Sequence, residues 1–356
     1  MGYVIDSAEK TQKSATEQET KTMLYLMGYM EDSKKIESFI IDAFNDVTAV
    51  DEDKTIYWDS QSKGDASSSP AAIGKELVTL FKNYISIFQF DYYILSLRKI
   101  VEKNIVESKR PLSNICVLKF EDFTNKAQQE IIDNLKKECN AKTYINVDEN
   151  IDKNIKSFLE IVKIVINNDS NGEYVKKITF MKDDLINDVV INDIFETIRK
   201  EQLAIKTRNH INGTELNKRE DAFTLNRTIH VKSINSLILA RIIGHDIISK
   251  NSVGLFIPTL FNDYIVKNGL TTEEIDGEVN DAINGIYSML INENLNKDFW
   301  DLIYAILEEC EKENKVYDVY HNILVNHSNI LYLRSAKEKE LIYLIACILG
   351  GKRNED

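Results

Sequence analysis

No histidine occurs before residue 210 of this 356-residue chain; the five histidines are His210, His230, His245, His321 and His327. A catalytic centre in the earlier part must therefore work without imidazole. The chain also has only 3 prolines and 13 glycines, which argues against long disordered linkers. Its four cysteines are widely spaced and form no Cys-x-x-Cys pair, so neither disulfides nor structural zinc is expected.

Long apolar runs are missing too, and no stretch reaches the length needed to span a bilayer. The first residues lack the basic and apolar regions of a signal peptide, so we expect a cytoplasmic protein with no membrane contact. Acidic side chains are in excess, giving a formal net charge of −13. Because affinity for nucleic acid comes mainly from Lys and Arg, any DNA contact needs a local basic patch or a partner.

The length suits two domains, and the pattern changes along the chain. Short apolar runs of strand length, 92–97 and 114–120, alternate with amphipathic segments such as the one that Ser69 and Pro70 begin. From about residue 178 onward, helix follows helix. We predict an α/β (α+β) domain over residues 1–205 and an all-α domain over residues 206–356, which would regulate the first domain or dock a partner.

One hairpin carries the candidate chemistry. The segments 39–50 and 55–63 are rich in strand formers and flank the turn cluster Asp-Glu-Asp-Lys. A turn across 51–54 places Val50 opposite Thr55, so paired positions sum to 105. Because side chains alternate along a strand, this register brings five polar residues to one face. They are Asp42, Asp46, Asp59, Gln61 and Lys63.

Such a cluster suits a metal-dependent hydrolase. Carboxylate, amide and carbonyl oxygens are the ligands that Mg²⁺ prefers, and Asp46, Gln61 and the backbone carbonyl of Ser62 would supply them. A metal bound there can polarise a phosphodiester and lower the pKa of an attacking water. Lys63 could orient that water or stabilise the charge that develops on the phosphate.

The sequence "IIDAFNDVTAV", then "IYWDSQSKG", then a helix resembles the PD-(D/E)xK nuclease superfamily, and the glutamine resembles its Mrr-like branch. The stretch is similar to effector nucleases of bacterial anti-phage systems: the double-stranded-DNA endonuclease effector of CBASS, the Lamassu nuclease subunit and nucleases paired with HerA-type ATPases. The resemblance covers roughly the first 200 residues. It implies a restriction-endonuclease-like fold in which Asp46, Gln61 and Lys63 are catalytic.

The resemblance also implies further features. Mg²⁺, with Mn²⁺ as a substitute, would be the cofactor, double-stranded DNA the substrate, and a 5′-phosphate the product end. Asp42 stands where the family often has a glutamate, and Glu17 lies where its first helix contributes polar residues, so Asp42, Asp59 and Glu17 are additional candidate acids. The expected biological role is destruction of phage or plasmid DNA. The partner would be an SMC-like or HerA-like ATPase or a second copy of the chain.

Several alternatives stay open. The helical part could bind a signalling nucleotide, although its size favours docking on an ATPase, and the nuclease fold could be a non-catalytic scaffold. The stretch 98–110 could contact DNA through Arg98, Lys99, Lys103 and Arg110, or form a solvated helix face. The second basic stretch, 196–210, could contact DNA or a nucleotide; an exposed connecting helix is the preferred interpretation.

Overall fold

The computed structural model describes residues 3–5, 13–65, 67–145, 149–179, 188–208, 210–253, 256–291, 296–330, 333 and 336–352. The chain divides into two compact units, Met1–Ile234 and Asn235–Asp356. The first is mixed α/β, and the second is helical in its described residues, as expected from the sequence. The predicted boundary after residue 205 lies within a helix of the first unit. None of the described helices combines the length and the apolar composition needed to cross a membrane.

A seven-stranded mixed sheet forms the centre of the first unit, in the order β6-β7-β5-β4-β3-β2-β9. β2, β3 and β4 form an antiparallel meander, and β5 lies parallel to both β4 and β7. A small second sheet joins β1 to β8. The strands are β1 (Tyr3–Val4), β2 (Ile36–Ile41), β3 (Val47–Asp51), β4 (Tyr57–Lys63), β5 (Tyr92–Leu97), β6 (Ile115–Leu118), β7 (Lys163–Asn167), β8 (Glu215–Leu216) and β9 (Thr228–His230).

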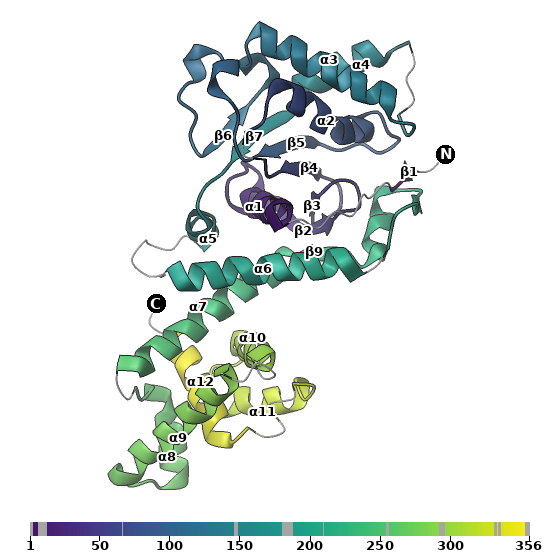
Figure 1. The fold of residues 1–356 in the computed structure, drawn as a ribbon. Coiled ribbons are helices and arrows are strands. Elements are labelled where there is room, and N and C mark those ends of the chain that lie inside the picture. Colours follow the sequence, from purple (N-terminus) through teal and green to yellow (C-terminus); the bar gives the residue numbers. More distant parts are fainter. Residues whose placement is uncertain are drawn as a thin grey trace. The chain divides into compact units, whose positions relative to one another are not determined.

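Helices cover both faces of this sheet (Figure 1). On one face α2 (Pro70–Tyr84) packs against β4 and β5, with α3 (Asn125–Ala141) and α4 (Ile151–Ile161) outside it. On the other face α1 (Lys13–Gly28) packs against the strands, and α5 (Asn171–Thr179) and α6 (Asp188–Arg208) pack on α1. The proposed site lies where these two layers meet the ends of β3 and β4.

Helix α2 begins where the sequence predicts. The Ser69 hydroxyl accepts the N–H of Ala72, and Pro70 occupies the first turn, where its missing N–H leaves no bond unmade. Gly74 lets α2 approach α3 closely, because a Cβ there would clash with the Ile131 carbonyl oxygen. Apolar burial holds this layer: Ile73, Leu77 and Phe81 are fully buried.

The predicted hairpin is wrong in two respects. The first segment is not one strand, because the chain turns at 42–46 between β2 and β3, with Asp42 at φ 56 and its N–H bonded to the Asp46 carbonyl. The register also differs, since Val50 pairs with Tyr57 and Thr48 with Asp59. The side chain of Asp51 explains the longer second turn: it accepts hydrogen bonds from the Thr55 and Ile56 N–H groups.

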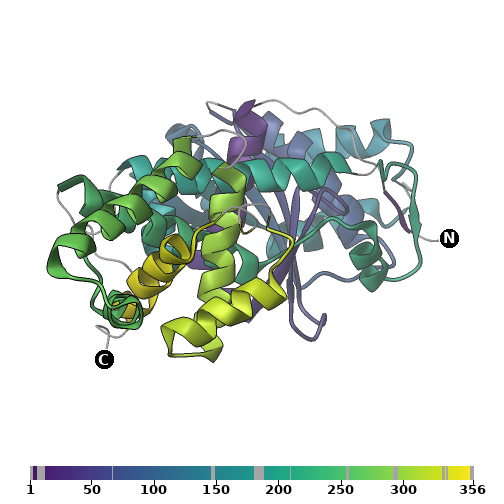
Figure 2. The ribbon, with the colours of Figure 1, turned by 90° about the horizontal axis from the view of Figure 1, so that it is seen from below.

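The second unit is built from helices in all its described segments. These are α7 (Val231–Val253, whose first residues belong to the first unit), α8 (Asn262–Asn268), α9 (Thr272–Ile291), α10 (Asn296–Lys312), α11 (Val316–Asn326) and α12 (Glu338–Lys352). Helix α12 packs against α9, α10 and α11 (Figure 2), and its Leu341, Leu344 and Ile345 are fully or almost fully buried. The apolar sequence of α12 therefore serves this core.

Candidate functional site

Asp46 joins the two strands that were expected to carry the site. Strand β4 continues beyond the last β3 partner, Val47, which pairs with Ser60. Beyond that point the Asp46 carboxylate, instead of a β3 residue, bonds to β4. Its Oδ2 atom accepts hydrogen bonds from the Ser62 N–H and the Ser62 hydroxyl, both at 2.7 Å, and from the Gln61 amide at 2.9 Å. Asp46 and Gln61 therefore meet despite the altered register.

The side chains of Asp59, Gln61 and Lys63 share one face of β4, as alternation along a strand predicts. Helix α2 lies across that face and contacts all three. The Asn83 amide donates to Asp59 (2.7 Å), the Thr79 hydroxyl to Gln61 (3.2 Å), and the Lys63 ammonium pairs with Glu76 (3.2 Å). The Lys63 side chain is 38% exposed, so its ammonium is held by a partner yet reachable from solvent.

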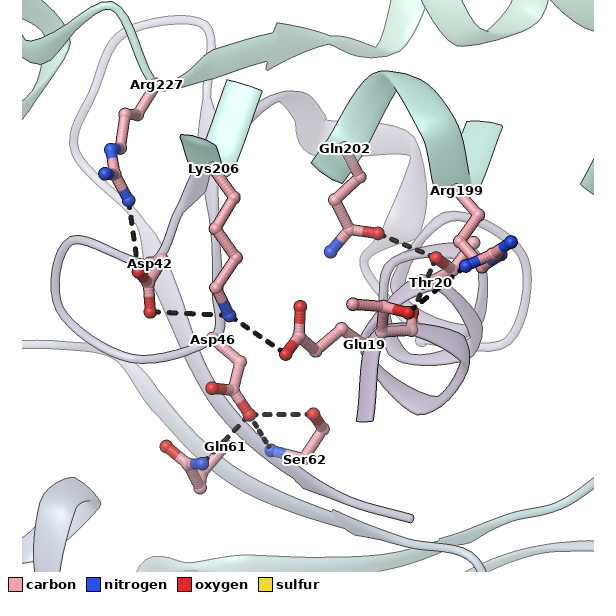
Figure 3. Close-up of polar contacts among 11 residues, drawn as sticks. Glu19, Thr20, Asp42, Asp46, Gln61, Ser62, Arg199, Gln202, Lys206 and Arg227 are labelled. Atoms are coloured by element: carbon pink, nitrogen blue, oxygen red, sulfur yellow. Dashed lines mark hydrogen bonds and ion pairs between the residues drawn. The ribbon is translucent and has the colours of Figure 1, made fainter. Parts of the chain in front are cut away.

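Asp42 does not join this face, which corrects the prediction that the acids share it. Its carboxylate lies 3.0 Å from the Arg227 guanidinium and 3.7 Å from the Lys206 ammonium of α6, in the opposite layer (Figure 3). The Arg227 side chain is fully buried, and the backbone carbonyl of Arg227 accepts the Ile41 N–H, which fixes it at the edge of β2. Asp42 thus takes part in a buried ion-pair network.

The α1 acid of the site is Glu19. Glu17 is 47% exposed and pairs with Lys21, whereas the Glu19 carboxylate is buried and lies 3.1 Å from the Lys206 ammonium. Burial raises the pKa of Glu19 to about 8; the charges of Asp46 and Asp42 add to this, and Lys206 opposes it. The sequence contains a helical-spacing signal for Glu19 and another for Lys206. Glu19 lies four residues before buried Met23, and Lys206 continues the helical stripe Ile194, Ile198, Gln202.

Lys206 is the lysine that acts electrostatically on Asp46. Burial raises the pKa of the Asp46 carboxyl above its usual range, and the strongest opposing effect is the Lys206 ammonium. Burial lowers the pKa of Lys206, but Glu19, Asp42 and Asp46 outweigh it, so the pKa lies above its ordinary value. The second basic stretch is therefore partly buried in the site, which corrects its interpretation as an exposed helix.

The residues around Asp46 fit a hard cation in donor chemistry. Asp46 provides a carboxylate, and the Thr79 hydroxyl can donate or accept, so Gln61 can turn its amide oxygen toward Asp46 without losing that bond. The Ser62 backbone carbonyl belongs to the same segment. Within the described ranges, no three His, Cys, Asp or Glu side chains come together closely enough to hold a metal ion.

The four basic residues proposed to contact DNA are all exposed. Arg98 and Lys99 directly follow β5, and the Arg98 N–H bonds to the Lys63 carbonyl, so the basic stretch begins beside Lys63. The segment is not the solvated helix face of the alternative interpretation, because it forms the short 3-10 turns 102–104 and 107–109. Arg110 is bound back to the Lys103 and Ile105 carbonyls.

Asp59 is buried away from solvent, and we therefore expect the free energy of unfolding to depend on pH. Burial raises its pKa from 3.8 to about 6, although hydrogen bonds from Asn83, Asn45 and Thr48 oppose the shift. Between these values the folded state binds more protons than the unfolded state, so stability falls as pH rises from about 4 to about 6. The expected loss is at most about 3 kcal/mol.

Denaturant unfolding at pH 4 to 7 would measure this component. Asp59→Asn should remove it, whereas Asp53→Asn, in the exposed turn before β4, should leave it in place. Equal pH slopes in wild type and Asp59→Asn would contradict the assignment.

Comparison of the chain with protein-family models, curated proteins and solved structures finds no match in any of the three.

Proposed function

We propose that this protein is a metal-dependent DNA endonuclease of the PD-(D/E)xK type, an effector that degrades phage or plasmid DNA when a partner or signal activates it. The observation that carries the proposal is the convergence at Asp46. Its carboxylate meets the Gln61 amide and the Ser62 N–H at the end of β4, and Lys63 follows on the same strand. The order of helix, three antiparallel strands, helix and parallel strand is compatible with such a domain.

Each residue has a defined task. Asp46, Gln61 and the Ser62 carbonyl would hold Mg²⁺ or Mn²⁺, which when bound supplies Lewis-acid activation and a water of lowered pKa. The Ser62 N–H and hydroxyl keep the Asp46 carboxylate oriented. The Lys63 ammonium, held by Glu76 at the exposed end of β4, stabilises negative charge on the phosphate. Arg98 and Lys99, beside it, neutralise neighbouring phosphates of the duplex.

We propose that the second unit regulates the nuclease activity of the first. A nuclease that cut without regulation would damage its own cell, and the acidic net charge of −13 favours a partner that supplies DNA affinity. We propose docking on an SMC-like or HerA-like ATPase, as in Lamassu or HerA-associated systems. Binding of a signalling nucleotide, as in CBASS, is the alternative.

A second candidate function is a non-catalytic scaffold subunit of such a defence complex. One observation favours it: charged groups of the site are already neutralised within the chain, since Lys63 pairs with Glu76 and Lys206 with Glu19. Cleavage assays separate the two candidates.

Lys63→Ala should reduce plasmid cleavage by about a hundredfold or more, since one electrostatic contact to the developing charge is typically worth this much. Purified protein, alone and with the products of neighbouring genes, would be incubated with plasmid and Mg²⁺ or Mn²⁺. Lys75→Ala, an exposed lysine on α2, is the matched control and should cleave like wild type. Absence of cleavage by wild type in every complex, or equal rates for Lys63→Ala, would favour the scaffold.

A further inference from the structure

Helix α2 and strand β4 carry two rows of polar side chains that meet one to one. Residues three or four apart on a helix are separated by about 4.5 to 6 Å along its axis, and alternate residues of a strand by about 6.6 Å, so two such rows stay in step over three pairs. The α2 row consists of Asn83, Thr79 and Glu76, which contact Asp59, Gln61 and Lys63 in that order. The helix therefore positions the face of β4 that the proposed chemistry uses.

Thr79 differs from other threonines in the described helices. The hydroxyls of Thr197 and Thr207, both in α6, donate to the carbonyl of the residue four positions earlier, which is a common bond in helices. Among the described residues, the Thr79 hydroxyl instead donates to the side-chain oxygen of Gln61, at 3.2 Å. This hydroxyl is therefore directed at β4 rather than at its own helix.

Gln61 has a side chain with two chemically different ends. Its nitrogen donates to the Asp46 Oδ2 atom at 2.9 Å (Figure 3), and its oxygen accepts from Thr79. A cation bound at Asp46 needs an oxygen ligand, so the amide has to turn over before Gln61 can bind it. Asp46 keeps two donors after this turn, because the Ser62 N–H and hydroxyl still bond to it.

We propose that Thr79 is the positioning residue of Gln61, and that its hydroxyl is the fixed partner about which the Gln61 amide turns. A hydroxyl both donates and accepts, so it can bond the amide oxygen before the turn and the amide nitrogen after it. Without the hydroxyl, the turned amide would direct its N–H groups at a methyl group, and an unpartnered N–H is tolerated less well than an unpartnered C=O. Loss of the hydroxyl therefore disfavours the ligand orientation more than the metal-free one.

This inference rests on the proposed function, because the turned amide matters only if a cation binds at Asp46. Thr79→Val should weaken Mn²⁺ binding by about tenfold, as calorimetry would measure, since loss of a group that orients a ligand typically costs at least this much. Thr79→Ser, which keeps the hydroxyl, should bind like wild type. So should Thr207→Val, the matched control at an exposed threonine whose hydroxyl bonds within α6.

A second background separates positioning from packing. In Gln61→Glu the side chain ends in two equivalent oxygens, so it has no orientation to select, and adding Thr79→Val should leave the Mn²⁺ affinity unchanged. A packing role of Thr79 would give the same loss in both backgrounds. Equal losses, or no loss when Thr79→Val is made in the wild type, would overturn the proposal.

The metal-free protein gives a readout that does not depend on a cation. The Gln61 side-chain amide, observed by NMR with isotope-labelled glutamine and assigned with Gln61→Ala, should exchange its hydrogens about fivefold faster in Thr79→Val, the factor that one ordinary hydrogen bond provides. Unchanged exchange would contradict the positioning role. Faster exchange in a protein that binds no Mn²⁺ would keep this role and refute the proposed metal site. Mn²⁺ binding and DNA cleavage that Thr79→Val leaves unaltered would keep the nuclease and refute the role of Thr79.

Discussion

Asp46→Asn is expected to abolish DNA cleavage, lowering the rate by about a thousandfold or more, because it removes the charged oxygen on which the proposed metal site depends. The substitution preserves size, and the asparagine oxygen can still accept the Ser62 N–H that now bonds to the carboxylate at 2.7 Å. The fold should therefore survive, as circular dichroism and thermal melting would verify. Rates would be measured by plasmid nicking in Mg²⁺ and in Mn²⁺.

Asp53→Asn is the matched control. Asp53 lies in the exposed turn before β4, so the variant protein should cleave DNA at the wild-type rate. Comparison with Lys63→Ala sharpens the assignment. Asp46→Asn should lose both Mn²⁺ binding and cleavage, whereas Lys63→Ala should lose cleavage and keep Mn²⁺ binding. A folded Asp46→Asn protein that cleaves normally would rule out Asp46 as the metal ligand.

Arg227→Met is expected to lower the free energy of unfolding of the first unit by about 3 to 5 kcal/mol, the usual result of breaking a buried ion pair from one side. The Arg227 side chain is fully buried and lies 3.0 Å from the Asp42 carboxylate. The Lys206 ammonium lies farther from the Asp42 carboxylate, at 3.7 Å, and also pairs with Glu19, so it would replace only part of the lost interaction. Denaturant unfolding followed by circular dichroism would measure the loss.

A double-mutant cycle tests the cause of this loss. Arg227→Met combined with Asp42→Asn should recover most of the stability, since the buried Asp42 charge is removed together with its guanidinium partner and asparagine tolerates the left-handed conformation at residue 42, where φ is 56. Arg98→Met, at an exposed arginine, should change stability by less than about 0.5 kcal/mol. A loss below about 1 kcal/mol in Arg227→Met would show that the pair contributes little.

The buried network links the proposed chemistry to elements far apart in the chain. Asp42 lies in the β2–β3 turn, Glu19 on α1, Lys206 on α6 and Arg227 beside β9. An event that shifts α6 would change the charge around Asp46 without touching β4. Regulation through the docking of α6 is therefore physically available to this domain.

Local sequence determined the parts of this protein whose physics is local. The Ser69-Pro70 start of α2, the strand at 92–97 and the change to helices in the second half all follow from capping, β propensity and periodicity over a few residues. The prediction that Asp46 and Gln61 lie together is confirmed, because the observed register differs from the predicted one by two residues. A shift of two residues keeps each side chain on its face.

Tertiary structure alone decided where the charges are neutralised. Two local features also escaped the strand pattern: Asp51 accepts the Thr55 and Ile56 N–H groups, which lengthens the second turn, and Asp42 adopts a left-handed conformation, which ends β2. Lys206 and Arg227 reach the site from 160 or more residues beyond Asp46 (206 − 46 = 160), and no local pattern specifies such a contact. Burial of charge is a property of the assembled layers, because only they exclude the water that would otherwise solvate Glu19, Asp42 and Asp46.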